Sequence, residues 1–458
     1  MNKNTKKKVG IFLPDGIGVR NYLYSGLVSQ LQSQNRMVIL FHCLGNDFNR
    51  FILNQIKIEC EIIEIPVYKE PKLLHFIREV ICWARLIYNT RKTKNKTILS
   101  NFKLKGKIHN RIFLIFAKVF GYLLSFNYTF LLNLEKVYEY FVKPLSADLY
   151  ELLNIDSLIC LHQRSINGIP FFKTAKSLGV NCSTVIFSWD NLPKARLNIR
   201  VNTYFVWSKY MKDELVLFYP EIQSDKIIIS GTPQFDFYKN SDNIIQKSLF
   251  YERYKIPQNV ELICFSGDDT LTSPYDPYYL DQLLLAVKDI GMQDKIWILF
   301  RPAPSESIDR YNFVISKYNN IVPICPEWTD TKNWNLKLPY FNDVKLLHNI
   351  IFHCIGVINI GSTMAIDFGI NNKPAAYFNY NMLDFNKWDI KYIYKFQHFK
   401  SMNGINPVDF INDFEDLKNW IIKIYKLRLS SYRSLEMEKW ISTICSDINA
   451  IEIISNNT

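Results

Sequence analysis

Short apolar runs alternate with amphipathic stretches along most of the chain. In the N-terminal half, runs typical of buried strands lie at residues 8–13, 37–43, 61–67, 157–161, 183–187, 201–206 and 226–230. Helix-like stretches occur between them, over residues 22–34 and 168–178. Strands that alternate with helices predict parallel sheets joined by crossover helices.

The alternation stops near residues 231–247 and then resumes. The segment GTPQFDFYKNSDNIIQK is polar and turn-rich, which is typical of a domain boundary. Further strand-like runs follow at 261–265, 296–300, 356–360 and 375–378, and residues 409–445 read as helices. The length of 458 residues fits two or three domains of about 100–200 residues each. We therefore predict an α/β protein with two doubly wound, Rossmann-like domains over 1–235 and 236–420, followed by helices over 421–458.

The region from about 90 to 145 departs from this pattern, and we expect a helical insertion there. The segment from Arg91 to Arg111 holds eight Lys or Arg and no acidic residue, and the apolar run 112–134 has Lys118 as its only charge. Basic residues beside an aromatic-rich apolar run are typical of a helix at an anionic membrane surface. A purely internal insertion and a membrane span, which needs about 20 apolar residues, remain alternatives.

Composition places the chain among globular proteins of a reducing compartment. Hydrophobic residues make up 48% and charged residues 21%, and the formal net charge is +12. The nine cysteines include no CxxC pair, and the basic start MNKNTKKKVG leads into no signal-peptide core. We expect a cytoplasmic protein that associates peripherally with the inner face of the plasma membrane. The basic excess accompanies no recognition motif for nucleic acid, so nucleic acid is not an expected partner.

Four stretches of the sequence together resemble a known family. They are FSWDNL at 187–192, VWSKYMKDEL at 206–215, ISGTPQFD at 229–236 and INIGSTMAIDFGINNKPAAYF at 358–378. In this order they resemble the bacterial surface-polysaccharide glycosyltransferases of the GT-B fold, and the related polyol-phosphate transferases of teichoic acid synthesis. The resemblance implies two domains facing a central cleft, with a nucleoside-diphosphate sugar on the second domain and the acceptor on the first.

This resemblance implies a glycosyltransferase that extends a lipid-linked glycan in the synthesis of a surface polysaccharide such as O-antigen or capsule. The chain has Arg301, Pro302, Ala303 and Pro304 where the family often has Arg-Pro-His-Pro, which disfavours sialic acid and polyol-phosphate donors. A polyol-phosphate transferase, a sugar-nucleotide epimerase of the same fold, and a non-catalytic scaffold of a polysaccharide assembly complex remain alternatives, because fold alone does not decide function.

The turn at Gly361, Ser362 and Thr363 is the leading candidate for the donor site. It lies between an apolar strand and the start of a helix, where free N–H groups and a partial positive charge suit a diphosphate. Asp367 follows Thr363 by four residues, on the same helix face, and suits ribose hydroxyls. The alternative is an ordinary hydroxyl cap with a solvated acid in the first turn.

Three further donor-binding candidates follow strands of the second domain. Gly267 would let the backbone approach a phosphate, Ser266 precedes it, and Arg301 would neutralise the leaving group. The adjacent pair Asp268 and Asp269 could ligate an ion, but a GDDT loop is more often a turn with a helix cap. No convincing metal cluster is evident, so we expect no required cofactor and leave a divalent metal open.

The first domain supplies three candidates for the group that removes the acceptor proton. Asp190 follows a strand, and the neighbouring indole of Trp189 would raise its pKa toward that of a useful base. Asn191 beside it, like Trp189, would contact the acceptor. His162, which follows the strand at 157–161, is the second candidate base. The alternative is a structural role for both, in which Asp190 caps a helix or turn and Trp189 belongs to the core.

The third candidate base is Asp15, in the loop PDGIGVRN. This loop resembles the acceptor-side loop of the GT-B fold. The resemblance implies that Gly18 and Arg20 contact the acceptor, with the guanidinium of Arg20 available to a phosphate.

Overall fold

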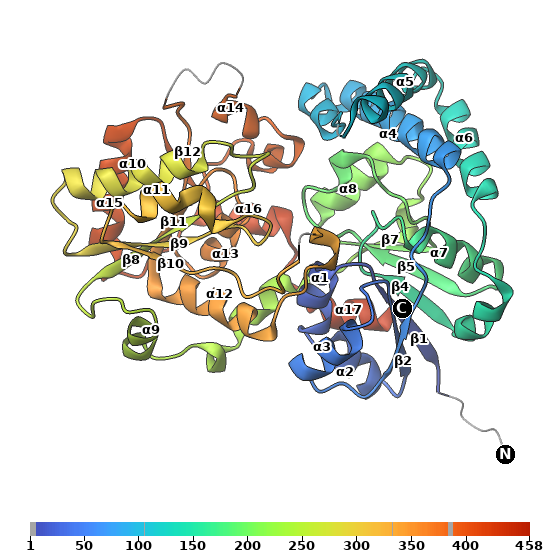
Figure 1. The fold of residues 1–458 in the computed structure, drawn as a ribbon, viewed down its shortest axis with the longest axis horizontal. Helices are drawn as coiled ribbons and strands as arrows, with labels where there is room; N and C mark the ends of the chain where they lie inside the picture. Colours follow the sequence, from blue (N-terminus) through green and yellow to red (C-terminus); the bar gives the residue numbers. More distant parts are fainter. Residues whose placement is uncertain (1–5, 105, 332, 383–387) are drawn as a thin grey trace.

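The computed structural model describes residues 6–104, 106–331, 333–382 and 388–458, and it contains two parallel sheets (Figure 1). The first sheet has the order β3-β2-β1-β4-β5-β6-β7. Its strands are β1 (Lys8–Leu13), β2 (Met37–His42), β3 (Glu61–Glu64), β4 (Ser157–Cys160), β5 (Asn181–Val185), β6 (Thr203–Val206) and β7 (Ile227–Ile229).

The second sheet has the order β10-β9-β8-β11-β12-β13. Its strands are β8 (Glu261–Ser266), β9 (Ile296–Arg301), β10 (Ile321–Pro323), β11 (Cys354–Asn359), β12 (Ala375–Phe378) and β13 (Asp409–Ile411). The central strands β4 and β11 are buried along their whole length, as expected for sheets covered by helices on both faces. The predicted fold class, two doubly wound α/β domains, is confirmed.

Helices cover both sheets (Figure 1). In the first half they are α1 (Gly16–Gly18), α2 (Leu27–Ser33), α3 (Phe48–Gln55), α4 (Lys72–Thr93), α5 (Ile108–Leu124), α6 (Tyr128–Phe141), α7 (Gly168–Ser177) and α8 (Lys209–Phe218). In the second half they are α9 (Lys247–Arg253), α10 (Asp276–Asp289), α11 (Asn312–Ile315), α12 (Phe341–His353), α13 (Met364–Ile370), α14 (Ile390–Ile393), α15 (Phe414–Leu427), α16 (Leu435–Ile444) and α17 (Ala450–Asn456).

Three features of the predicted secondary structure are wrong. Residues 409–411 form the edge strand β13 rather than part of a helix, and β10 was not predicted; both strands have only three residues, too few for a period to be visible. The helix expected over 22–34 is divided. Residues Val19–Leu23 form a π-helix, and Gly26 then takes a left-handed conformation with φ of +87° before α2 begins.

The expected insertion is a layer of three helices beside the first sheet. It begins with α4 at Lys72, before the expected start at about 90. The apolar run 112–134 is split between α5 and α6, because Asn127 caps α6 by accepting a hydrogen bond from the Phe130 N–H (2.9 Å). A Cβ at Gly121 would lie 2.7 Å from the Val80 carbonyl oxygen, so α5 packs closely on α4. In the part of the chain that the structure describes, no helix combines the length and apolarity needed to cross a bilayer.

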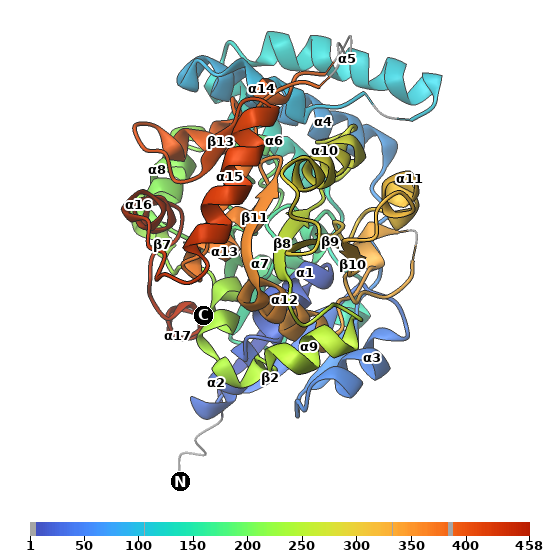
Figure 2. The same ribbon diagram turned by 90° about the vertical axis from the view of Figure 1, so that its left-hand side faces the viewer.

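The C-terminal helices predicted over 421–458 connect the two halves. The N–H of Ser446 donates to the Trp207 carbonyl (2.9 Å), and the side chain of Gln34 donates to Ser455 (2.9 Å). Helix α17 consequently lies against α2 of the first half, while α15 packs on α10 of the second (Figures 1 and 2). The chain thus crosses between the halves twice, once after β7 and once after α15.

Candidate functional site

A cavity of about 980 Å³ lies between the two halves of the molecule. This volume is at the upper end of the range for small-molecule sites, about 300–1,000 Å³. The predicted site residues that line it are Trp189, Asp190, Gly361, Ser362 and Thr363. The structure therefore brings together candidates from both predicted domains, separated by more than 160 positions in the sequence.

The second-half wall of the cavity is formed by the turn between β11 and α13. Gly361 has φ of +76°, and a Cβ there would lie 3.0 Å from the Phe399 ring, so the position requires glycine. The Ser362 N–H donates to Asn359 Oδ1 (2.9 Å), which fixes the turn. The side chain of Thr363 makes no capping hydrogen bond to α13. Ser362 Oγ instead accepts a long hydrogen bond from the Met364 N–H (3.5 Å), so the hydroxyl cap of the alternative interpretation is present at Ser362 and absent at Thr363.

Ser266 and Asp367 lie behind this turn, outside the cavity lining. Ser266 Oγ lies 3.4 Å from Ser362 Oγ. Asp367 is buried, and its Oδ1 accepts a hydrogen bond from the hydroxyl of Tyr238 (2.6 Å), a residue of the segment that links the two halves. Burial raises the pKa of Asp367, and this effect outweighs the opposing hydrogen bond of Tyr238 and the positive charges of Arg20 and Arg301. Arg20, expected on the acceptor side, thus acts on the predicted donor carboxylate.

Arg301 does not point into the large cavity, contrary to its predicted orientation. Its Nη2 donates to both carboxylate oxygens of Asp343 (2.8 and 3.1 Å), while its buried Nη1 has no partner among the described residues. The backbone at Gly267 is not open to a phosphate either, because a Cβ there would lie 2.9 Å from the Tyr311 hydroxyl and 3.2 Å from Asp276. Close packing explains this glycine.

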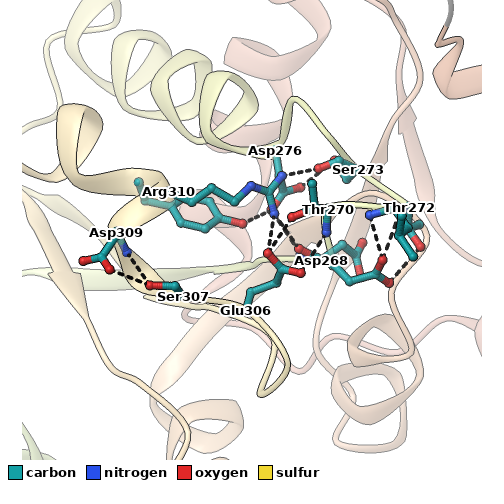
Figure 3. A network of polar contacts seen from close by, with 12 residues as sticks. Asp268, Thr270, Thr272, Ser273, Asp276, Glu306, Ser307, Asp309 and Arg310 are labelled. Carbon is teal, nitrogen blue, oxygen red and sulfur yellow. Dashed lines mark hydrogen bonds and ion pairs between the residues drawn. The ribbon is translucent and has the colours of Figure 1, made fainter. Parts of the chain in front are cut away.

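The loop that contains Asp268 and Asp269 belongs to the polar network of Figure 3. Asp269 accepts hydrogen bonds from the N–H groups of Leu271 (2.9 Å) and Thr272 (3.1 Å), so it caps a turn. Burial, followed by the neighbouring charge of Asp276, raises the pKa of Asp268 well above its usual range. Across the described residues, no group of three or more His, Cys, Asp or Glu side chains could hold a metal ion.

Asp190 lines the first-half wall, but its pKa moves opposite to the prediction. Its carboxylate accepts hydrogen bonds from Lys194 (2.5 Å), Ser188 (2.7 Å) and Asn191 (3.0 Å). Burial alone would raise the pKa of Asp190, but the charge of Lys194 and these hydrogen bonds hold it well below its usual range. The expectation that Trp189 would make Asp190 more basic is wrong. Trp189 instead packs edge-on against His398 of the second half, at a ring separation of 4.6 Å.

Asp15 and His162 form a pair outside the cavity lining, where the His162 ring stacks on Phe187, the neighbour of the lining residue Ser188. They follow the adjacent strands β1 and β4, and Asp15 Oδ2 makes a short hydrogen bond with His162 Nδ1. Asp15 Oδ1 accepts from the N–H groups of Ile17 (3.0 Å) and Gly18 (3.1 Å). Burial opposes ionisation, but the charge and hydrogen bond of His162, with these backbone bonds, lower the pKa of Asp15. The second ring nitrogen of His162, Nε2, is buried and makes no hydrogen bond within the described chain.

Several lining residues were not predicted from the sequence. The side chains of Arg164, Lys194, Arg196 and His398 line the cavity, as do residues of the insertion between Thr97 and Lys103. Lys194 and Arg196 follow directly on the FSWDNL stretch, so their position was a usable signal. The contribution of the insertion had no such signal, because only the tertiary structure brings residues 97–103 to the cleft.

Comparison with known proteins places this architecture among characterised folds. The chain resembles a glycosyltransferase from Rickettsia africae (TM-score 0.52, 10% identity, covering 99% of this chain and 97% of that one). It also resembles a UDP-GlcNAc 2-epimerase from Methanocaldococcus jannaschii (TM-score 0.52, 12% identity, covering 98% of this chain and 99% of that one). A variant of the wall teichoic acid polymerase TagF is similar as well (TM-score 0.52, 12% identity, covering 99% of this chain and 88% of that one). No family model and no curated protein matches the sequence. At these identities the likeness establishes the two-domain GT-B-like fold.

Proposed function

We propose that the protein is a glycosyltransferase that moves a sugar from a nucleoside-diphosphate sugar to a lipid-linked glycan acceptor during assembly of a surface polysaccharide. The observation that carries this proposal is the cavity shared by both halves, because it combines anion-compatible hydroxyls with a wall of titratable side chains. The fold supports the proposal, since proteins with the same architecture include a glycosyltransferase, a teichoic acid polymerase and an enzyme named for UDP-GlcNAc.

The second-half wall is the proposed donor side. The turn at Gly361, Ser362 and Thr363 offers backbone N–H groups and two hydroxyls to the diphosphate, whose negative charge increases as the glycosidic bond breaks. Asp367, one helical turn further along α13, is the proposed partner of the ribose. Binding would exchange its hydrogen bond from Tyr238 for hydrogen bonds from the nucleotide.

The first-half wall is the proposed acceptor side. An acceptor hydroxyl must lose its proton as it attacks the anomeric carbon. Because Nδ1 of His162 is held by Asp15, the proposed base is Nε2 of the same ring, which is buried behind this wall rather than on it. The Asp15 carboxylate would orient the ring and stabilise the imidazolium that forms. Asp190 is the alternative base, and its depressed pKa makes it a weaker one. Trp189 and Asn191 would contact the acceptor, and no step of this scheme requires a metal.

A sugar-nucleotide epimerase is the second candidate, since the same fold occurs in a UDP-GlcNAc 2-epimerase. Transfer is favoured because residues of the helical insertion, among them Thr97, Ser100 and Asn101, add a further segment to the cavity wall, where an acceptor could bind.

The discriminating experiment has two steps. Thermal-shift measurements against UDP-, GDP-, CDP- and dTDP-linked sugars should identify one nucleotide class that raises the melting temperature. Mass spectrometry with that donor, with and without a polyprenyl-linked glycan, then separates the reactions. A glycan heavier by one sugar supports transfer, and an epimerised donor in the absence of glycan supports the epimerase. The absence of a thermal shift with every donor would contradict both.

A further inference from the structure

Helix α5 has two apolar faces, of which only one is packed. Ala117, Gly121 and Leu124 are buried, and their spacing of four and three residues defines the face that contacts α4. Lys118, the only charge in the run, also turns inward, with its Nζ 4.6 Å from the Trp83 ring centroid. The outward face of α5 is therefore left without a charge along this run.

The outward face carries large hydrophobic side chains at helical spacing. Its members are Ile108 (78% exposed), Ile112 (49%), Ile115 (48%), Phe116 (56%), Val119 (53%) and Leu123 (62%). Such a stripe is the mark of a buried helix face, yet here it lies in solvent. Phe126, which follows α5, and Phe130, in the first turn of α6, are exposed as well. Contiguous exposed patches of this kind mark interaction sites.

Basic residues border this surface. Exposed side chains at the end of α4, in the following segment and at the start of α5 include Arg91, Lys92, Lys94, Lys96, Lys107 and Arg111. Arg91 lies over the Phe126 ring, with its guanidinium carbon 4.3 Å from the ring centroid, so charge and apolar surface meet. No Asp or Glu occurs between residues 91 and 134. A ligand that matches this surface must therefore have an apolar region for the exposed hydrophobic side chains and an adjoining anionic region for the basic border.

We propose that the exposed face of α5 and the first turn of α6, called here the docking face, binds the surface of an anionic phospholipid bilayer. Apolar side chains would enter the acyl boundary while the Lys and Arg side chains meet lipid phosphates. A second copy of the chain fits less well, because a two-fold contact would place each basic border against its own copy. Figures 1 and 2 show α5 across one end of the molecule, with α4 beneath it and α6 running from that end along the side of the first half.

Docking there would also orient the cleft. The 3₁₀ segment Lys96–Asn101 directly follows α4 and contributes Thr97, Ser100 and Asn101 to the cavity wall. The docking face and the cavity are thus joined by one short segment. A bilayer held at the docking face would present lipid headgroups near the mouth of the cleft. The inference itself goes beyond the proposed reaction and does not depend on it.

Flotation of the purified full-length chain tests this directly. Vesicles of phosphatidylcholine with phosphatidylglycerol should carry the protein upward at low salt, and high salt or removal of phosphatidylglycerol should reduce the bound fraction, by about fivefold for each Lys or Arg engaged. The triple variant Ile112→Gln, Phe116→Gln and Leu123→Gln should lower the partition coefficient at least about tenfold, because apolar area no longer leaves water. All three positions are exposed, so the variant should keep the wild-type melting temperature.

A matched control changes three equally exposed apolar residues elsewhere: Leu249→Gln, Leu429→Gln and Leu435→Gln (52%, 84% and 66% exposed). This control should float like the wild type. Wild-type protein that stays at the bottom with anionic vesicles at low salt would overturn the proposal, and so would a docking-face variant that floats normally. A dimer by light scattering that only the docking-face variant abolishes, without vesicle binding, would also overturn it. Nucleotide thermal shifts, measured on the same proteins, report separately on the proposed reaction.

Discussion

The two walls of the cleft use different chemistry. On the first-half wall, charged side chains are held in pairs, with Lys194 bound to Asp190 and Arg196 bound to Glu79 (2.9 Å). On the second-half wall, the turn at residues 361–363 presents backbone and hydroxyl groups, held in place by close packing around Gly361. Such a division suits a transfer reaction, because proton removal needs titratable groups and a leaving diphosphate needs fixed donors.

Asp190 and Asp367 show how strongly the surroundings decide the behaviour of one residue type. Asp367 is buried and the Asp190 side chain is 28% exposed at the cavity wall, and burial by itself would raise the pKa in each case. Direct contact with the Lys194 ammonium reverses this effect at Asp190, whereas among the described residues the carboxylate of Asp367 contacts the Tyr238 hydroxyl, with Arg20 and Arg301 further away. The presence of a direct ion pair at Asp190 and its absence at Asp367 therefore explains why the two pKa values move in opposite directions. We expect the two residues to differ in function as well.

The largest effect is expected at the proposed base. His162→Ala should lower kcat by about 10²–10⁴-fold and leave nucleotide affinity unchanged, because the ring acts only on the acceptor proton. Asp190→Asn, on the cavity wall itself, is the matched comparison, and we expect a loss of kcat below about tenfold. Steady-state kinetics and calorimetric titration of the nucleotide provide both readouts. If the two losses are reversed, Asp190 is the base and the Asp15–His162 pair is structural.

The contact between the halves should depend on pH. Glu214 of α8 is buried, its Oε1 accepts a hydrogen bond from Gln397 of the second half (3.3 Å), and burial raises its pKa to about 8. Between pH of about 5 and 8 the folded protein keeps a proton that the unfolded chain loses, so stability falls as pH rises through this window. Glu214→Gln should remove a slope of up to about 1.4 kcal/mol per pH unit. Denaturant melts at several pH values check this, and parallel curves for wild type and variant would contradict it.

The second-half wall is tested through nucleotide affinity. Asp367→Ala should weaken binding of the free nucleoside diphosphate and of the sugar nucleotide equally, by about 1–3 kcal/mol, the value of hydrogen bonds to a charged group. Tyr238→Phe is the control, because it removes the present hydrogen-bond partner and keeps the carboxylate. It should weaken binding by less than 1 kcal/mol, roughly. Unchanged affinity in folded Asp367→Ala protein would refute the assignment.

The smallest expected effect is a difference in unfolding free energy that distinguishes backbone strain from side-chain crowding at the turn at residues 361–363. Gly361 and Gly404 both have positive φ, +76° and +80°, but only at Gly361 would a Cβ meet a side chain. Gly404→Ala should cost about 1–2 kcal/mol of unfolding free energy from strain alone. Gly361→Ala should cost more and should also weaken nucleotide binding, as measured by thermal and chemical melts with and without the nucleotide. Equal costs in both variants would show that the Phe399 contact yields freely.

Sequence patterns predicted most of the fold but few of the side-chain roles. The apolar runs identified the central strands well, since a strand buried on both faces needs several consecutive apolar residues. They missed β10 and β13, which occupy sheet edges and have three residues each. The turn at 361–363 was placed correctly between β11 and α13, because glycine at a strand end is a local signal.

The roles of Arg301, Gly267 and Asp190 could not be predicted in the same way. The ion pair with Asp343 decides where the Arg301 side chain points, and the nearby Tyr311 hydroxyl leaves no room for a side chain at position 267. The contact with Lys194 decides the direction in which the pKa of Asp190 moves. Two of these partners lie more than 40 positions away in the sequence. A local pattern contains no information about these two pairings, whereas Lys194 lies four residues after Asp190, within reach of a local pattern.

The sequence by itself determined the two α/β halves, the turn at 361–363 and the apolar, basic character of the insertion, because each depends on the order of neighbouring residues. Only the tertiary structure decided that Asp15 meets His162, that Asp367 meets Tyr238, and that one face of α5 stays exposed while Lys118 turns inward. These outcomes depend on which strand ends become adjacent and on which helix covers which face. Long-range packing sets both, after the local elements have formed.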